Sequence, residues 1–145
     1  MSDLRQEWTI LQNQHEQLER SGLWIKLLAF VIALVGIAVP FVAWGAVLLV
    51  AGLWLQEAIY KTFQNRLGER LLTIEQAISS GNELTPFQLH SAWEAQRPGV
   101  VGLFLEYFKN SLRPTVAFPY VFLIATTLIF LNFYQSTFAQ AFGAA

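Results

Sequence analysis

The chain has 145 residues, enough for one domain, and 54% of them are hydrophobic, a larger share than soluble domains carry. It contains no cysteine, so disulfides, iron–sulfur clusters, thiolate zinc sites and cysteine nucleophiles are excluded. The formal net charge of −1 gives no electrostatic case for a nucleic-acid partner. The excess of apolar side chains must face something other than water, and membrane lipid is the expected surrounding.

The first predicted element is an amphipathic helix over residues 1–22. Leu4, Trp8, Leu11 and Leu18 recur at helical spacings, and Gln, Glu and Asn fill the positions between them. The segment is acidic as well as basic. The apolar run after it is too long for a signal-peptide core and lacks a small-residue cleavage pattern, so we expect the N-terminus to belong to the mature protein.

A transmembrane hairpin is predicted over residues 23–60. No charged or strongly polar side chain occurs from Leu27 to Leu55, and one helix over this stretch and its flanks would be too long for a single crossing. Gly36 and Pro40 supply a break, because proline cannot continue a helix but suits the first position of the next. Each leg is short for a crossing helix, so a re-entrant hairpin is the alternative.

Small residues recur within this hairpin. Ala29, Ala33 and Gly36 lie along the first leg, and Gly45 and Gly52 lie a heptad apart on the second. Such residues let helix backbones approach closely. We expect them to pack inside the hairpin, with contact to another subunit as the alternative.

A second amphipathic helix is predicted over residues 61–80. The two amphipathic stretches flank the hairpin symmetrically, so its legs are expected to continue into the cytoplasm as an antiparallel pair with facing apolar stripes. The expected interaction seam consists of Leu4, Trp8, Leu11, Leu18, Phe63, Leu67, Leu71, Ile74 and Ile78. Lys26 and Glu57 come out at similar depth near the inner membrane surface. They could form an ion pair, or Lys26 could extend alone to the headgroups.

Residues 81–114 are expected to form a short helix and an interfacial helix. The helix signals at Thr85 and Pro86 predict the start of the short helix, which reaches toward Arg97. The stretch from Val100 to Arg113 is apolar around most of its circumference and directly precedes a membrane segment, so a position in the membrane interface is favoured over packing in a soluble bundle. Its narrow polar stripe consists of Glu106, Lys109, Asn110 and Arg113.

The third transmembrane helix is predicted over residues 115–138, followed by an uncharged tail over residues 139–145. All nine Lys and Arg residues precede this helix, and neither the hairpin turn nor the tail carries charge. The positive-inside rule therefore places the N-terminus and the central section in the cytoplasm and the C-terminus outside, in a cell membrane expected to be a bacterial inner membrane.

Common catalytic signatures are absent from the sequence. His15 and His90 each precede a glutamate by four residues, Glu19 and Glu94, a spacing that places both side chains on one helical face. This spacing is commoner on solvated helices than in metal sites. No catalytic residue, metal or cofactor is therefore assigned.

The predicted fold class is an all-α integral membrane protein with three transmembrane helices, a cytoplasmic helix pair and an interfacial amphipathic helix. The favoured function is a non-catalytic membrane subunit, assembly factor or adaptor, because the chain carries more apolar surface than three helices can bury. One alternative is a homo-oligomeric pore or membrane-perturbing effector, in which copies of the third helix line a channel through Thr126, Thr127, Asn132 and Gln135. Another is an enzyme that acts on a lipid or quinone through His90, Glu94 or His15. The expected partners are membrane lipid and another membrane protein or a second copy, with no nucleic acid.

Overall fold

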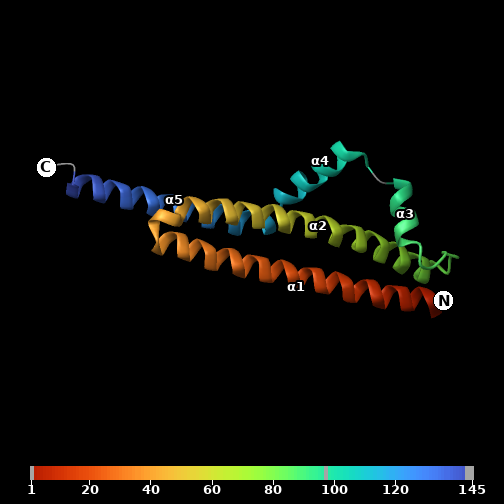
Figure 1. Ribbon diagram of the computed structural model, residues 1–145. Helices are drawn as coiled ribbons and strands as arrows, with labels where there is room; N and C mark the ends of the chain where they lie inside the picture. Colours follow the sequence, from red (N-terminus) through yellow and green to blue (C-terminus); the bar gives the residue numbers. More distant parts are fainter. Residues whose placement is uncertain (1, 97, 143–145) are drawn as a thin grey trace. The chain divides into compact units, whose positions relative to one another are not determined.

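The computed structural model describes residues 2–96 and 98–142, and each element formed by these residues is a helix (Figure 1). In chain order the elements are α1 (Ser2–Ala38), a short 3-10 helix (Pro40–Val42), α2 (Ala43–Ser80), α3 (Leu89–Gln96), α4 (Val100–Ser111) and α5 (Pro114–Phe142). The chain divides into two compact units. The first unit comprises Met1–Gly22 and Ile59–Asn110, and the second comprises Leu23–Ala58 and Ser111–Ala145.

The two long helices, α1 and α2, each contribute to both units. They contain 37 and 38 residues, so each predicted amphipathic stretch and its adjoining hairpin leg form one unbroken helix. Gly22 and Gly68 lie inside these helices without ending them. A single glycine costs a helix interior about 1 kcal/mol relative to alanine, which a long helix with tertiary contacts tolerates.

The reversal between α1 and α2 occupies only Val39 to Val42. The Val39 N–H donates to the Val35 carbonyl at 2.9 Å, and the Val42 N–H donates to the Val39 carbonyl at 3.1 Å. Pro40 has no N–H to satisfy and opens the 3-10 helix. The turn therefore meets these hydrogen-bonding needs within its own backbone, although no polar side chain is present there.

Within residues 2–96 and 98–142, three helical stretches are long and apolar enough to cross a membrane. They are Ser2–Ala38, Pro40–Ser80 and Pro114–Phe138, with mean hydropathies of 2.2, 1.7 and 2.0 in their most apolar windows. Between 17% and 28% of the residues in those windows are buried, so most of this apolar surface is uncovered by the chain itself. These helices are compatible with a membrane location.

The core of the second unit is built on small residues. The buried residues Ala29 and Ala33 of α1 meet Val50 of α2 and Tyr120 and Leu123 of α5. Alanine at these positions leaves room for large side chains from the neighbouring helices.

The tightest approach in the second unit occurs at Gly36. A Cβ atom built there would lie 2.6 Å from the Ala46 Cβ and 3.4 Å from the Thr127 Cγ2, so α1 contacts α2 and α5 at this point. A Cβ atom at Gly45 or Gly52 would meet no atom within 4 Å. The five small residues of the predicted hairpin thus divide into three that pack inside the unit and two that face away from its interior.

Replacement of Gly36 by alanine should destabilise the second unit, because the added methyl group overlaps Ala46 and overpacking costs about 1–3 kcal/mol. The matched control is Gly52→Ala, for which we expect no loss and a gain of up to about 1 kcal/mol from helix propensity. Thermal unfolding of both variants in mild detergent measures the difference. Equal melting temperatures for the two variants would show that the approach at Gly36 is not a tight contact.

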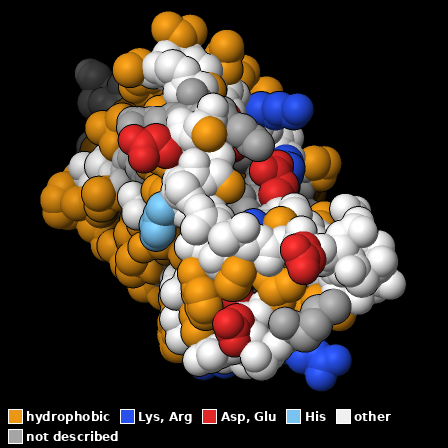
Figure 2. Space-filling model, turned by 90° about the vertical axis from the view of Figure 1, so that its right-hand side faces the viewer, with side chains coloured by type: hydrophobic (Ala, Val, Ile, Leu, Met, Phe, Trp, Pro, Cys, Tyr) orange, Lys and Arg blue, Asp and Glu red, His pale blue; other side chains and the backbone are white. Residues whose placement is uncertain are grey.

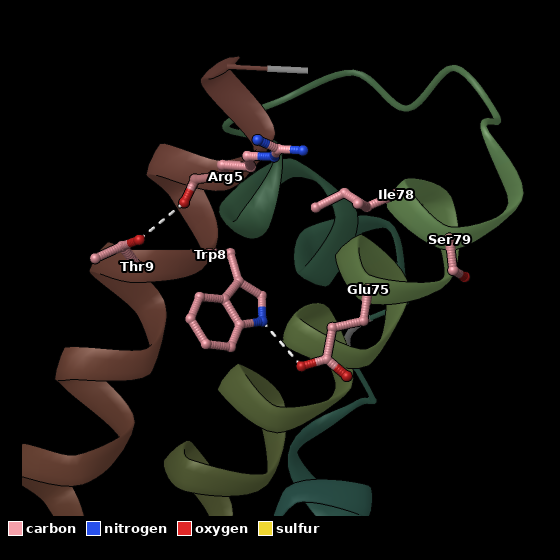
Figure 3. Close-up of a pocket in the computed structure, with 6 residues that line it drawn as sticks. All are labelled: Arg5, Trp8, Thr9, Glu75, Ile78 and Ser79. Atoms are coloured by element: carbon pink, nitrogen blue, oxygen red, sulfur yellow. Dashed lines mark hydrogen bonds between the residues drawn. The ribbon is translucent and has the colours of Figure 1, made fainter.

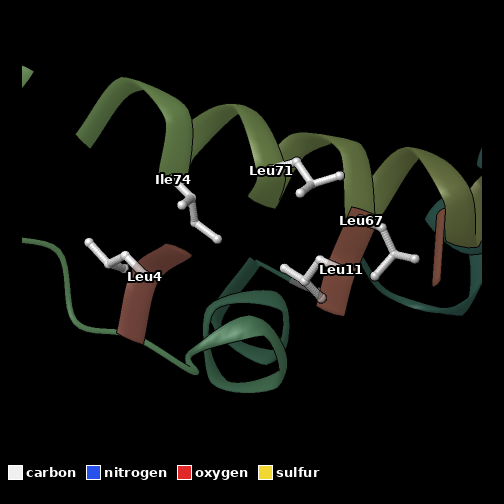
Figure 4. Packing of buried hydrophobic residues seen from close by; sticks show 5 residues of the cluster. All are labelled: Leu4, Leu11, Leu67, Leu71 and Ile74. Atoms are coloured by element: carbon white, nitrogen blue, oxygen red, sulfur yellow. The ribbon is translucent and has the colours of Figure 1, made fainter. Parts of the chain in front are cut away.

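The core of the first unit joins α1 to α2 (Figure 4). Leu4 and Leu11 of α1 form a buried cluster with Leu67, Leu71 and Ile74 of α2. In Figure 4, Leu4 lies toward Ile74 and Leu11 toward Leu67, so the two helices run in opposite directions. Five partly buried side chains pack against this cluster, from α1, α2, the following loop and α3: Trp8, Leu18, Ile78, Leu84 and Leu89.

Phe63 is the one residue of the predicted seam outside this cluster. Its side chain is 45% exposed, and the guanidinium group of Arg66 lies 5.3 Å from the centre of its ring. Phe63 therefore belongs to a separate polar and aromatic group on α2. The side of the membrane on which these residues lie stays a prediction.

Replacement of Ile74 by aspartate should unfold or loosen the first unit. Ile74 is 0% exposed, and an unpaired carboxylate at a buried site costs several kcal/mol or forces the helices apart. The control is Leu72→Asp, two residues away on the same helix but 58% exposed, where we expect a change within about 0.5 kcal/mol. Thermal unfolding in detergent distinguishes them, and an unchanged melting temperature for Ile74→Asp would contradict the packing described.

Candidate functional site

The polar side of α4 faces α2. The carboxylate of Glu106 lies 3.2 Å from the guanidinium nitrogen Nη2 of Arg66. One turn further along α4, the Asn110 side chain accepts a hydrogen bond from the Asn65 amide at 3.2 Å and donates one to the Thr62 hydroxyl at 2.7 Å. These partners span one turn of α2, so α4 is attached to α2 at two adjacent points.

The apolar side of α4 faces outward. Val101 is 74% exposed, Phe104 69% and Phe108 63%. A helix packed on a water-soluble core has the opposite arrangement, with apolar side chains inward and polar ones outward. Of the predicted polar stripe, Glu106 and Asn110 are bonded to α2, whereas Lys109 is exposed and Arg113 is partly exposed.

Arg66 also joins α3 to this arrangement. Its guanidinium carbon lies 4.6 Å from the ring centre of Trp93 on α3 and 5.3 Å from that of Phe63, while the same group pairs with Glu106. Cation–π contacts contribute about 0.5–2 kcal/mol, and more when they are shielded from water. The spacing of three residues between Phe63 and Arg66 on one helix indicates the first of these contacts. The contact with Trp93 depends on how α3 packs against α2 and is not indicated by the sequence.

A buried ion pair connects α1 and α2 inside the first unit. The Arg70 Nε donates to one oxygen of Glu7 at 2.9 Å and Nη2 donates to the other at 3.2 Å, which is a bidentate geometry. Arg70 also donates to the Thr85 carbonyl at 3.1 Å, and the Phe87 N–H donates to Glu7 at 2.7 Å. The pair therefore fixes the loop between α2 and α3 as well as the two helices.

This ion pair explains why the short helix begins later than Thr85 and Pro86 predict. The Thr85 carbonyl and the Phe87 N–H are bonded to buried side chains, and Phe87 has a φ of 58°, which is incompatible with a right-handed helix. α3 consequently starts at Leu89. Its predicted end near Arg97 lies outside the described residues.

A groove of about 430 Å³ lies between α1 and α2 (Figure 3). The indole nitrogen of Trp8 on α1 donates to the carboxylate of Glu75 on α2 at 2.9 Å, and Ile78 and Arg5 contribute to its walls.

The face drawn in Figure 2 carries acidic, basic and histidine side chains beside apolar ones, so charge of a single sign does not dominate it.

A polar cluster in the second unit involves α1, α2 and α5. The Lys26 ammonium of α1 lies 2.8 Å from Glu57 of α2, and the Tyr120 hydroxyl of α5 donates to the same carboxylate at 2.6 Å. Trp54 stacks on Tyr120 with ring centres 6.3 Å apart and donates to the Ser111 carbonyl at 2.9 Å. Lys26 and Glu57, proposed from the sequence as a possible ion pair, are thus brought together, with Tyr120 as a partner that the sequence did not indicate.

The remaining polar candidates do not converge. Within the described part of the chain, no group of three or more His, Asp or Glu side chains could hold a metal ion, and His15 and His90 are part of none. The hydroxyls of Thr126 and Thr127 donate to the carbonyls of Phe122 and Leu123 in their own helix at 2.8 Å. Their bonds are therefore local to α5.

Replacement of Glu7 by glutamine should destabilise the first unit by roughly 3–5 kcal/mol, because it leaves the Arg70 charge buried without its counter-charge. The same change should release the loop held by Arg70 and Glu7. The control is Glu19→Gln at an exposed position of the same helix, for which we expect no measurable change. Thermal unfolding and limited proteolysis in the loop from residue 81 to residue 88 report the two effects. A loop equally protected in both variants would contradict the role of the ion pair.

No family model, no curated protein and no solved structure matches this chain. The function is therefore inferred from three features of the chain itself: the outward apolar side of α4, the polar bonds between helices and the apolar helix surfaces that the chain leaves uncovered.

Proposed function

We propose that this chain is an integral membrane protein that serves as a non-catalytic small subunit, assembly factor or adaptor and docks a partner protein through its cytoplasmic and membrane helices. In this proposal α1, α2 and α5 each cross an inner membrane, and α4 is an interfacial helix. The N-terminus and the residues between α2 and α5 lie in the cytoplasm and the C-terminus lies outside. The placement of all nine Lys and Arg residues before α5 supports this orientation.

The main support for the proposal is that the buried charged side chains form bonds between helices. Glu7, Arg70 and Glu57 are the buried charged side chains among the described residues, and each is paired with a side chain from another helix. Within the same residues, every buried side-chain nitrogen or oxygen has a hydrogen-bond partner. This buried polar chemistry serves to hold helices together, which is what a scaffold requires.

The uncovered surface is the second line of support. Large apolar side chains are exposed along the second unit, including Leu48 and Leu49 on α2 and Phe118, Ile129 and Phe133 on α5. In a bilayer such side chains contact lipid or the helices of another protein. In the first unit, the groove at Trp8 provides further apolar surface for contact with a partner.

The direct test is affinity purification of the tagged chain from native membranes in mild detergent, followed by mass spectrometry and size analysis. We expect a different membrane protein at a fixed stoichiometric ratio. The same preparation of Gly36→Ala, whose second unit should be loosened, is expected to retain less of that partner than Gly52→Ala. The comparison therefore links docking to the packing of the membrane helices.

Two other outcomes would contradict the adaptor proposal. A discrete oligomer of this chain alone that conducts ions in a planar bilayer would establish a pore. A turnover of lipid or quinone that is lost in His90→Ala, with unchanged thermal unfolding, would establish an enzyme.

A further inference from the structure

The orientation of α4 is held by polar bonds on its inner side. Glu106 and Asn110 are bonded to Arg66, Asn65 and Thr62 of α2. Rotation of α4 to bury its apolar side against α2 would break all of these bonds and leave polar groups without partners. The polar bonds to α2 therefore fix the apolar side of α4 in its outward position.

The outward side chains form a continuous apolar face. Val101, Phe104, Leu105 and Phe108 follow spacings of three, four and seven residues, which places them on one side of a helix. All four are exposed. Lys109 borders this face and is exposed, and no acidic residue lies on it, because Glu106 is turned toward Arg66. An apolar face bordered by a cation is typical of helices that lie in a bilayer surface.

The chain itself limits what can cover this face. α4 ends at Ser111 and α5 begins at Pro114, so three Cα–Cα steps separate them, a reach of about 11 Å. α5 is one of the helices long and apolar enough to cross a membrane. If α5 crosses, this connection keeps the C-terminal end of α4 within that reach of the lipid headgroups, close enough for its apolar side chains to contact the bilayer.

We propose that the outward face of α4 is a lipid-binding surface that inserts Val101, Phe104, Leu105 and Phe108 into the boundary between headgroups and acyl chains, with Lys109 against anionic headgroups. The inference rests on the membrane location proposed above, because α5 supplies the tether. In this inference the bilayer covers the outward face of α4, and a second copy of the chain or a partner protein does not.

The absence of cysteine makes a site-specific test direct. Phe104→Cys and Phe108→Cys are labelled with an environment-sensitive nitrobenzoxadiazole dye, and the full chain is reconstituted at one copy per nanodisc made of phosphatidylcholine and phosphatidylglycerol. Thr73→Cys, an exposed position of α2, is the water-facing control, and Ile129→Cys on α5 is the membrane control. We expect dye at 104 and 108 to be quenched by nitroxide lipids, with a several-fold lower iodide quenching constant than dye at 73.

Iodide quenching at 104 and 108 equal to that at 73, with lipid quenching retained at 129, would overturn the inference and leave the membrane location intact. Iodide access at 129 as well would overturn the membrane location itself. Protection that appears only when two or more copies share a nanodisc would identify a second copy as the occupant and overturn the inference. Because the purified chain is used alone, protection in single-copy nanodiscs excludes a partner protein.

The headgroup contact is tested by lipid composition. We expect protection at 108 to increase when phosphatidylglycerol is added to phosphatidylcholine nanodiscs and this increase to be lost in Lys109→Gln. The control is Lys61→Gln on α2, whose ammonium group is bonded to Gln64 at 2.6 Å, and it should retain the increase. An increase that persists in Lys109→Gln would overturn the assignment of Lys109.

Discussion

The reversal of the chain at Pro40 is the constraint on which the remaining structure depends. An apolar run without a charge from Leu27 to Leu55 would otherwise favour one continuous helix, and proline interrupts it because it lacks an N–H and clashes with the preceding turn. α1 and α2 therefore return alongside each other, and each of them supplies residues to both units. The later elements add to this pair: α3 and α4 to the first unit and α5 to the second.

Polar bonds between the helices then determine which of several possible packings of their apolar faces is formed. Apolar contacts have little directional preference, whereas a bidentate pair such as Glu7–Arg70 requires one relative position of its two helices. The carboxylate of Glu57 plays the corresponding role in the second unit, where it accepts from Lys26 and Tyr120. Buried ion pairs are weak evidence for stability but can specify a unique register, and this is the role we assign to them here.

The use of polar side chains in bonds between helices also connects the fold to the proposed function. The acidic and amide side chains of α4 are bonded inside the first unit, so the surface that α4 offers is apolar and is bordered by the exposed Lys109. The helices of the second unit likewise carry large apolar side chains on their outward faces, such as Leu48 and Phe133. The paired buried charges and the exposed apolar side chains are the two features on which we base the proposal of anchoring and docking.

The helices, their amphipathic faces and the turn at Pro40 were determined by local sequence, because hydrophobic periodicity and proline geometry act within a few residues. Most of the seam, including Leu11 and Ile74, followed from the same periodicity. The later start of α3 did not, because it depends on the bonds of Thr85 and Phe87 to Arg70 and Glu7, and Phe87 and Glu7 are 80 residues apart. The inward turn of Glu106 and the outward position of Phe63 likewise depend on Arg66 and its neighbours. Only the tertiary structure decided these features, since a side chain pairs with what folding brings near it.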